Sequence, residues 1–68
     1  MKDLPRSEWE RLIDEWIIGS NAERNRAILK RRMLDGIALE PLAEEFDLSV
    51  SQIKRIINDS RKKLFRNI

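Results

Sequence analysis

Apolar residues recur every three to four positions in four successive segments of the chain, which is the spacing of amphipathic α-helices. We expect helices over residues 5–18, 21–35, 39–46 and 50–65. No segment alternates apolar and polar residues for more than a few positions, so the pattern gives no indication of strands. The sequence therefore predicts an all-α protein, a four-helix compact domain over residues 1–68.

The first predicted helix carries a continuous apolar stripe formed by Trp9, Leu12, Ile13, Trp16 and Ile17. Both tryptophans share the phase of the aliphatic residues, so we expect them to anchor the core. Pro5 suits the first turn of a helix. Ser7 and Glu10 have the spacing of a capping box, which would start the helix later. Gly19 is expected to end it.

Two further capping signals precede the second and fourth predicted helices. Ser20 and Glu23 have the spacing of a capping box before the second helix. Ser49 and Gln52 have the same spacing before the fourth. Gly36 is a natural left-handed end for the second helix.

The third predicted helix is short and is followed by a turn over residues 47–49. Pro41 fits only in a first turn, which puts the start of the helix near Leu39. Ala38 is a poor N-cap, so we expect this end to be weakly held. Asp47 is expected to adopt a left-handed conformation, which Asp tolerates better than most residues.

Residues 39–66 have the pattern of a helix-turn-helix at the C-terminal side of the domain. Seven apolar residues fall where two crossed helices would meet: Leu42, Ala43, Phe46, Leu48, Ile53, Ile56 and Ile57. The small Ala43 lets the second helix come close. With Ile53, Ile56 and Ile57 facing inward, the opposite side of the last helix would be free to enter a DNA major groove.

Charge is divided unevenly along the chain, although the net charge is only +2. Residues 1–23 hold three basic and six acidic side chains, a net charge of −3. Residues 39–48 hold four acidic side chains and no basic one, whereas residues 49–68 hold six basic side chains and a single acid, Asp59. A positive last helix beside a negative helix favours a polyanion that touches one surface. A solvated helix face is the alternative.

The chain contains no Cys and no His. Disulfides, thiolate chemistry, imidazole catalysis and nearly all zinc or transition-metal sites are therefore excluded. We expect no cofactor, no metal and no enzymatic activity, because no nucleophile stands beside a base. No apolar run is long enough to span a membrane and the N-terminus has no signal-peptide pattern, so the expected location is cytoplasmic.

Four segments carry a family resemblance: RAILKRRMLDG, LEPLAEEFDLS, SQIKRII and the basic RKKLFR. Together, from Arg26 to Arg66, they resemble region 4 of the bacterial sigma-70 family and the wider set of sigma-like helix-turn-helix domains. In that family, region 4 reads the promoter −35 element through its last helix and also contacts the flap of RNA polymerase. The resemblance implies sequence-specific binding of double-stranded DNA by a small transcription regulator, of the type found on phages or mobile elements.

The family's base-reading positions correspond here to Val50, Ser51, Gln52, Lys54 and Arg55. The family typically has Arg and Glu in place of Val50 and Ser51, which argues against recognition of a standard −35 sequence.

Arg55 is the first candidate for a base contact, because a guanidinium can bind guanine O6 and N7 in a bidentate manner. Gln52 and Asn58 are candidates for adenine, and Val50 for a thymine methyl group. The residues assigned to phosphate contacts are Ser51, Lys54, Lys62 and Arg31. For Gln52 and Asn58, plain solvent exposure is an equal alternative.

Other functions remain open. The chain could be a protein-interaction module that binds RNA polymerase or an anti-sigma-like partner through its acidic first helix. It could also be the DNA-recognition domain of a phage terminase small subunit. Because one helix-turn-helix contacts few base pairs, tight binding calls for a homodimer or a larger machine. The Trp-bearing first helix, or Phe65 and Ile68, offers a dimer surface; alternatively, both regions cap a monomer core.

Overall fold

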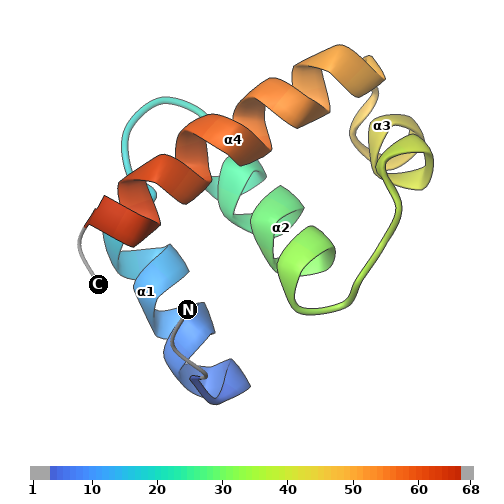
Figure 1. The fold of residues 1–68 in the computed structure, drawn as a ribbon. Coiled ribbons are helices and arrows are strands. Elements are labelled where there is room, and N and C mark those ends of the chain that lie inside the picture. Colours follow the sequence, from blue (N-terminus) through green and yellow to red (C-terminus); the bar gives the residue numbers. More distant parts are fainter. Residues whose placement is uncertain (1–3, 67–68) are drawn as a thin grey trace.

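The computed structural model describes residues 4–66, and every regular element in that range is a helix. The helices are α1 (Arg6–Trp16), α2 (Ala22–Met33), α3 (Leu39–Phe46) and α4 (Val50–Arg66), joined by short connections (Figure 1). The Cα radius of gyration is 11.4 Å, close to the value of about 11 Å expected for a compact chain of this length. The predicted all-α architecture is confirmed.

The longest helix, α4, contacts each of the other three helices. It lies across the top of the molecule in Figure 1, with α3 beside its N-terminal end and α1 below its C-terminal end. Within the described range, α1 and α3 do not contact each other. Helix α2 likewise contacts each of the other three, so α1 and α3 both pack against α2 and α4.

An apolar core fills the space between the four helices. Its most deeply buried side chains, each at most 2% exposed, are Ile13, Ile17, Ile28, Leu29, Leu42, Ile53 and Leu64. Ala43 and Ile57 are buried in the same core, whereas Ile56 is only partly buried because it lies at the edge of the buried stripe. No helix among residues 4–66 has the length and apolar character needed to cross a bilayer.

The boundaries of α1 and α2 differ from the predicted ones. α1 begins at Arg6 with Pro5 as its N-cap, so the capping box of Ser7 and Glu10 does not form. It ends at Trp16 instead of residue 18, because Ile17 has an extended backbone and turns the chain towards α2. α2 covers residues 22–33, two residues short of its predicted end.

Trp16 is not a core anchor, and that prediction is wrong. Its side chain is 37% exposed, because Ile13 and Ile17 fill the contact between α1 and the rest of the core. The apolar stripe of α1 is thus wider than the surface that its neighbours cover. Trp9 is partly buried and meets the ring of Phe65 edge-on, with ring centroids 6.0 Å apart. Phe65 remains 38% exposed, on one of the surfaces considered for a dimer; Ile68 lies outside the described residues.

Only one of the two capping boxes predicted for α2 and α4 forms. The Ser49 Oγ accepts the Gln52 N–H at 3.1 Å, and the Gln52 Oε1 accepts the Ser49 N–H at 2.9 Å. At α2 the N-cap is Asn21, in a left-handed conformation (φ 61°) and without a side-chain capping bond. The prediction for Ser20 is therefore wrong, because the reversal through Gly19 (φ 96°) and Asn21 starts the helix one residue later.

The connection between α3 and α4 is held by its own backbone. Asp47 is left-handed (φ 56°), as predicted. Its N–H donates to the Glu44 carbonyl at 3.3 Å, and the Leu48 N–H donates to the Ala43 carbonyl at 2.9 Å. This pair of bonds is a Schellman motif in which Asp takes the position usually held by Gly. At the other end of α3, Ala38 is the N-cap and provides no side-chain bond, also as predicted.

The difference between the two serines gives a matched stability test. Replacement of Ser49 by Ala should lower the free energy of unfolding by about 1 kcal/mol, because it removes a capping hydrogen bond. Replacement of Ser20 by Ala should change it by less than about 0.5 kcal/mol, since Ser20 caps nothing. Urea unfolding followed by circular dichroism measures both. Equal losses in the two variants would contradict the described ends of α2 and α4.

Candidate nucleic-acid interface

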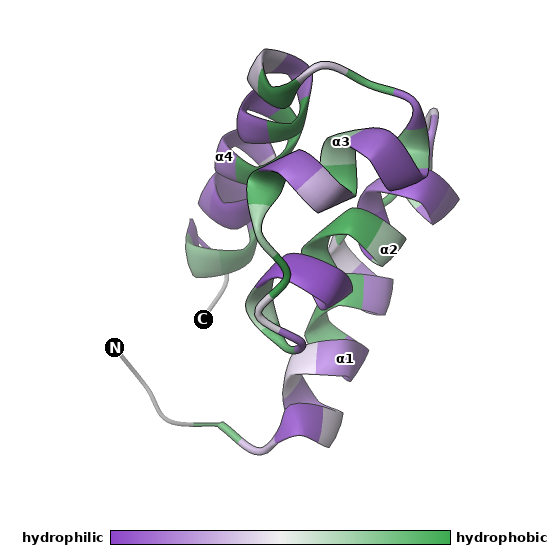
Figure 2. Cartoon of the chain, turned by 90° about the vertical axis from the view of Figure 1, so that its right-hand side faces the viewer, coloured by the Kyte–Doolittle hydropathy of each residue, from purple (hydrophilic) through white to green (hydrophobic). Residues whose placement is uncertain are grey.

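The side of α4 opposite its buried stripe is exposed along the whole helix. Ile53, Ile57, Ser60 and Leu64 form the buried stripe. Because each residue advances the helix by about 100°, the opposite direction is occupied by Ser51, Arg55, Asn58, Asp59, Lys62 and Arg66, all of them exposed. We call these six residues the outward face. In Figure 2 the side of α4 that points away from the other helices is largely hydrophilic.

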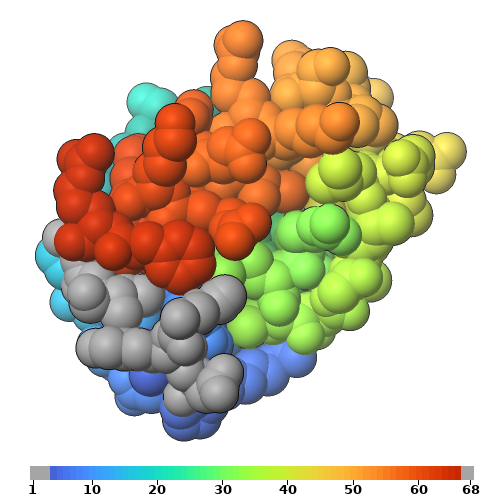
Figure 3. Space-filling view, in the orientation of Figure 1, coloured from blue at the N-terminus to red at the C-terminus, as the bar shows by residue number. Residues whose placement is uncertain are grey.

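Six of the eight residues predicted to contact DNA are exposed on α4: Ser51, Gln52, Lys54, Arg55, Asn58 and Lys62. Four of them belong to the outward face, whereas Gln52 and Lys54 lie on its two flanks. In Figure 3 the side chains of α4, coloured orange to red, cover the upper part of the visible surface. Helix α4 thus brings most of the candidate set to one accessible side of the molecule.

The other two predicted residues lie elsewhere. Val50 is partly buried and packs against the core, so only part of its side chain is accessible. Arg31, assigned to phosphate, is on α2, and its Nε lies 2.6 Å from the Glu45 Oε1 on α3. Arg31 therefore does not belong to the outward face, and an acid already neutralises its charge.

The cations of α1 and α2 all donate to acceptors of the protein. Their acceptors are carboxylates, backbone carbonyls or a side-chain amide, and the seven residues are Arg6, Arg11, Arg24, Arg26, Lys30, Arg31 and Arg32. Two examples that join different elements are Lys30 to Asp14 at 2.8 Å and Arg26 to the Ile17 carbonyl at 2.7 Å. The cations of α1 and α2 are therefore already in contact with other groups of the protein.

Most cations of α4 are not engaged in this way. Within residues 4–66, no ion pair or hydrogen bond involves the side chains of Lys54, Arg55, Lys62 or Arg66. Arg61 lies over the ring of Phe65, with its Cζ 5.5 Å from the ring centroid. Because α4 has a single acid, Asp59, its positive charge is not compensated within the helix. The outward face can therefore attract an anionic partner without breaking contacts of the fold.

Acidic side chains border this face at its N-terminal end. Glu40, Glu44 and Asp47 on and after α3 are exposed, and Glu45 is paired with Arg31. Their negative charge disfavours a polyanion over α3 and favours one that runs along α4. The border thus restricts the orientation in which an anionic partner can approach.

Acidic side chains of α1 form ion pairs with basic side chains of the protein. Arg11 lies 2.8 Å from a carboxylate oxygen of Glu8 and 2.9 Å from one of Glu15. The hydrogen bond from Arg11 lowers the pKa of the Glu8 carboxyl below its ordinary value. Such exposed pairs contribute little stability, but they leave α1 with less free negative charge than its sequence suggests.

The sequence pattern did not assign Arg66 to this face, because Arg66 lies one residue beyond the predicted end of the last helix. Extending the helical periodicity by that residue would have found it. The same periodicity within the predicted helix places Asp59 at the edge of this face. Asp59 is notable because it is an acid among cations, and no ion pair within the described residues involves it.

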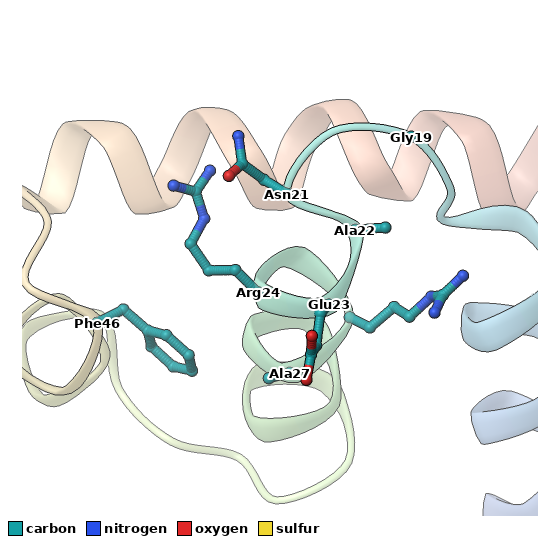
Figure 4. Close-up of a pocket in the computed structure, with 8 residues that line it drawn as sticks. Gly19, Asn21, Ala22, Glu23, Arg24, Ala27 and Phe46 are labelled. Atoms are coloured by element: carbon teal, nitrogen blue, oxygen red, sulfur yellow. The ribbon is translucent and has the colours of Figure 1, made fainter.

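An open groove of about 790 Å³ lies between the start of α2 and Phe46. Figure 4 shows the ring of Phe46 pointing towards the first turns of α2, with Ala27 on the facing side. The guanidinium groups nearby are engaged: Arg24 Nε donates to Asn25 at 3.2 Å and Arg26 to Ile17. Among the described residues, no cluster of acidic side chains could hold a metal ion. The groove is also lined by Asn21 and Glu23, whose side chains make no hydrogen bond or ion pair with residues 4–66.

In comparisons with known proteins, no family model, no curated protein and no solved structure matched the chain.

The contrast between the two sets of cations gives a stability prediction. Replacement of Lys54, Arg55 or Lys62 by Gln should change the free energy of unfolding by less than about 0.5 kcal/mol. Replacement of Arg26 by Met keeps much of the apolar stem but removes the bond to Ile17, and should cost about 1–2 kcal/mol. Urea unfolding measures all four variants. A larger loss in an α4 variant than in Arg26→Met would assign that cation a structural role.

Proposed function

We propose that the chain binds double-stranded DNA in a sequence-specific manner, with α3, the turn and α4 acting as a helix-turn-helix and α4 entering the major groove. The observation that carries the proposal is the set of exposed, unpaired cations on α4, in a molecule whose α1 and α2 cations are all engaged. A major groove about 12 Å wide admits an α-helix.

The spacing of the polar residues suits two kinds of contact. Recognition helices read bases from their N-terminal half, where Ser51, Arg55 and Asn58 lie on the outward face. Lys62 follows Arg55 by about 10 Å along the helix axis, so it meets the backbone where the groove curves away. We assign base reading to Arg55 and Asn58, and phosphate contact to Lys62.

The remaining assignments follow from exposure. Ser51 and Lys54 contact phosphates beside the groove, and Arg66 joins Lys62 at the C-terminal end. The accessible part of Val50 packs against a thymine methyl group. Arg31 is left out of the interface because Glu45 holds it.

The biological role we propose is transcription regulation, which the resemblance of residues 26–66 to sigma region 4 supports. The alternatives of RNA polymerase or anti-sigma-like binding, and of a terminase small subunit, are outcomes of the same experiments. The paired carboxylates of α1 favour DNA binding over docking of a basic partner on that helix.

Substitutions at Arg55 and Lys62 should distinguish recognition of a base from electrostatic attraction to the phosphates. Arg55→Ala should relax specificity at one base pair, with a loss of about 1–3 kcal/mol, roughly 5- to 150-fold, against the preferred base. Lys62→Ala should weaken binding to all duplexes alike and reduce the slope of log affinity against log salt by about 1. Fluorescence anisotropy with selected and scrambled duplexes over a range of salt concentrations measures both effects.

Two variants serve as controls in this experiment. Arg11→Ala removes the same charge from the exposed side of α1 and should leave the salt slope unchanged. Asp59→Asn removes the acid from the outward face and should strengthen binding to every duplex. If Arg55→Ala and Lys62→Ala cause equal, sequence-independent losses, Arg55 reads no base. If the protein binds RNA polymerase but no DNA duplex, it acts as a protein-interaction module.

A further inference from the structure

We infer that Gln52 contacts a base edge as a hydrogen-bond donor, through its amide NH2 group, while its amide oxygen stays in the N-cap of α4. This inference rests on the proposed function and deepens it, since it names the chemistry that one position of the DNA site must present. Gln52 then selects a base with a hydrogen-bond acceptor in the major groove.

The geometry of the N-cap supports this assignment. The Gln52 Oε1 accepts the backbone N–H of Ser49 at 2.9 Å, and the Gln52 N–H donates to the Ser49 Oγ at 3.1 Å. The side chain is nevertheless exposed. No acceptor for its amide NH2 group is present among residues 4–66. The two N–H donors of this group therefore face solvent at the end of α4 that reads bases.

A bidentate contact with adenine is the usual role of Gln in a major groove. It requires the amide oxygen to accept from adenine N6 while the NH2 group donates to N7. Here the oxygen is committed to the Ser49 N–H, which is one of the backbone donors that a helix leaves unpaired at its start. A bidentate contact with adenine would require this oxygen to accept a second hydrogen bond through its other lone pair, whereas donation from the NH2 group alone adds no bond to the oxygen.

Donation alone separates cytosine from the other three bases. Guanine offers O6 and N7, thymine offers O4 and adenine offers N7 as acceptors in the major groove. Cytosine presents only its N4 amino group there. A donor at Gln52 should therefore permit guanine, thymine or adenine and disfavour cytosine at one position, whereas a bidentate glutamine would select adenine alone.

Replacement of Gln52 by Glu removes the NH2 donors of the side chain but keeps an oxygen that can accept the Ser49 N–H. A carboxylate at this position still accepts the Ser49 N–H, because Ser-x-x-Glu is itself a capping box. It has no hydrogen to donate, and it can accept from cytosine N4. The variant should therefore remain folded and change its base preference at one position, although its added negative charge weakens binding to all DNA.

The experiment is a parallel selection of duplexes from a random pool by the wild-type chain and Gln52→Glu at the same salt concentration. The wild type should select against cytosine at one position, and Gln52→Glu should shift that position towards cytosine by roughly 5-fold or more while the others stay unchanged. Ser49→Ala is the matched control: it retains the backbone N–H that holds the amide oxygen, so it should keep the wild-type preference.

Two results would overturn the inference while leaving the proposed function in place. Enrichment of adenine alone, with guanine and thymine excluded, at the position altered by Gln52→Glu would mean that the amide oxygen also contacts the base, in a bidentate manner. Identical selected sequences for the wild type and Gln52→Glu would mean that Gln52 touches no base. If the wild type enriches no sequence at all, the proposed function fails and this inference fails with it.

Discussion

Burial of one stripe of α4 is the constraint on which the rest of the structure depends. Ile53, Ile57, Ser60 and Leu64 face α1, α2 and α3, and α4 is the element that all three share. Because these residues recur at helical spacing, their burial fixes the rotation of α4 about its axis. The same rotation turns Arg55, and the rest of the outward face, towards solvent.

Whether a basic side chain is paired or unpaired depends on whether a hydrogen-bond acceptor lies near it. α2 lies between the acids of α1 and α3 and near the carbonyls of two connections, so Lys30 and Arg31 find carboxylates while Arg26 and Arg32 find backbone oxygens. α4 has one acid of its own and turns its outward face away from the others. Most basic side chains of α2 therefore contact other elements of the fold, whereas Lys54, Arg55, Lys62 and Arg66 of α4 are available for a partner, although the two helices have similar composition.

The sequence predicted the four helices, the left-handed Asp47 and the burial of Ile53 and Ile57, because each depends on local periodicity or local backbone preference. It did not predict the exposure of Trp16, since that depends on how much of α1 its neighbours cover. The sequence also predicted capping boxes at both Ser49 and Ser20, of which only the one at Ser49 forms. The left-handed backbone of Asn21 determines where α2 starts and leaves Ser20 outside the cap. The pairing of Arg31 with Glu45 likewise needed the packing of α2 against α3.

The central claim is that the outward face of α4 is the surface that meets DNA. The most direct measurement is an NMR titration of the full chain with a short duplex, in which backbone amide shifts are followed residue by residue. The account predicts that the largest changes occur over residues 50–62, with little change along the exposed side of α1. Changes concentrated on α1 or at the groove beside Phe46, or no saturable change at moderate salt, would contradict it.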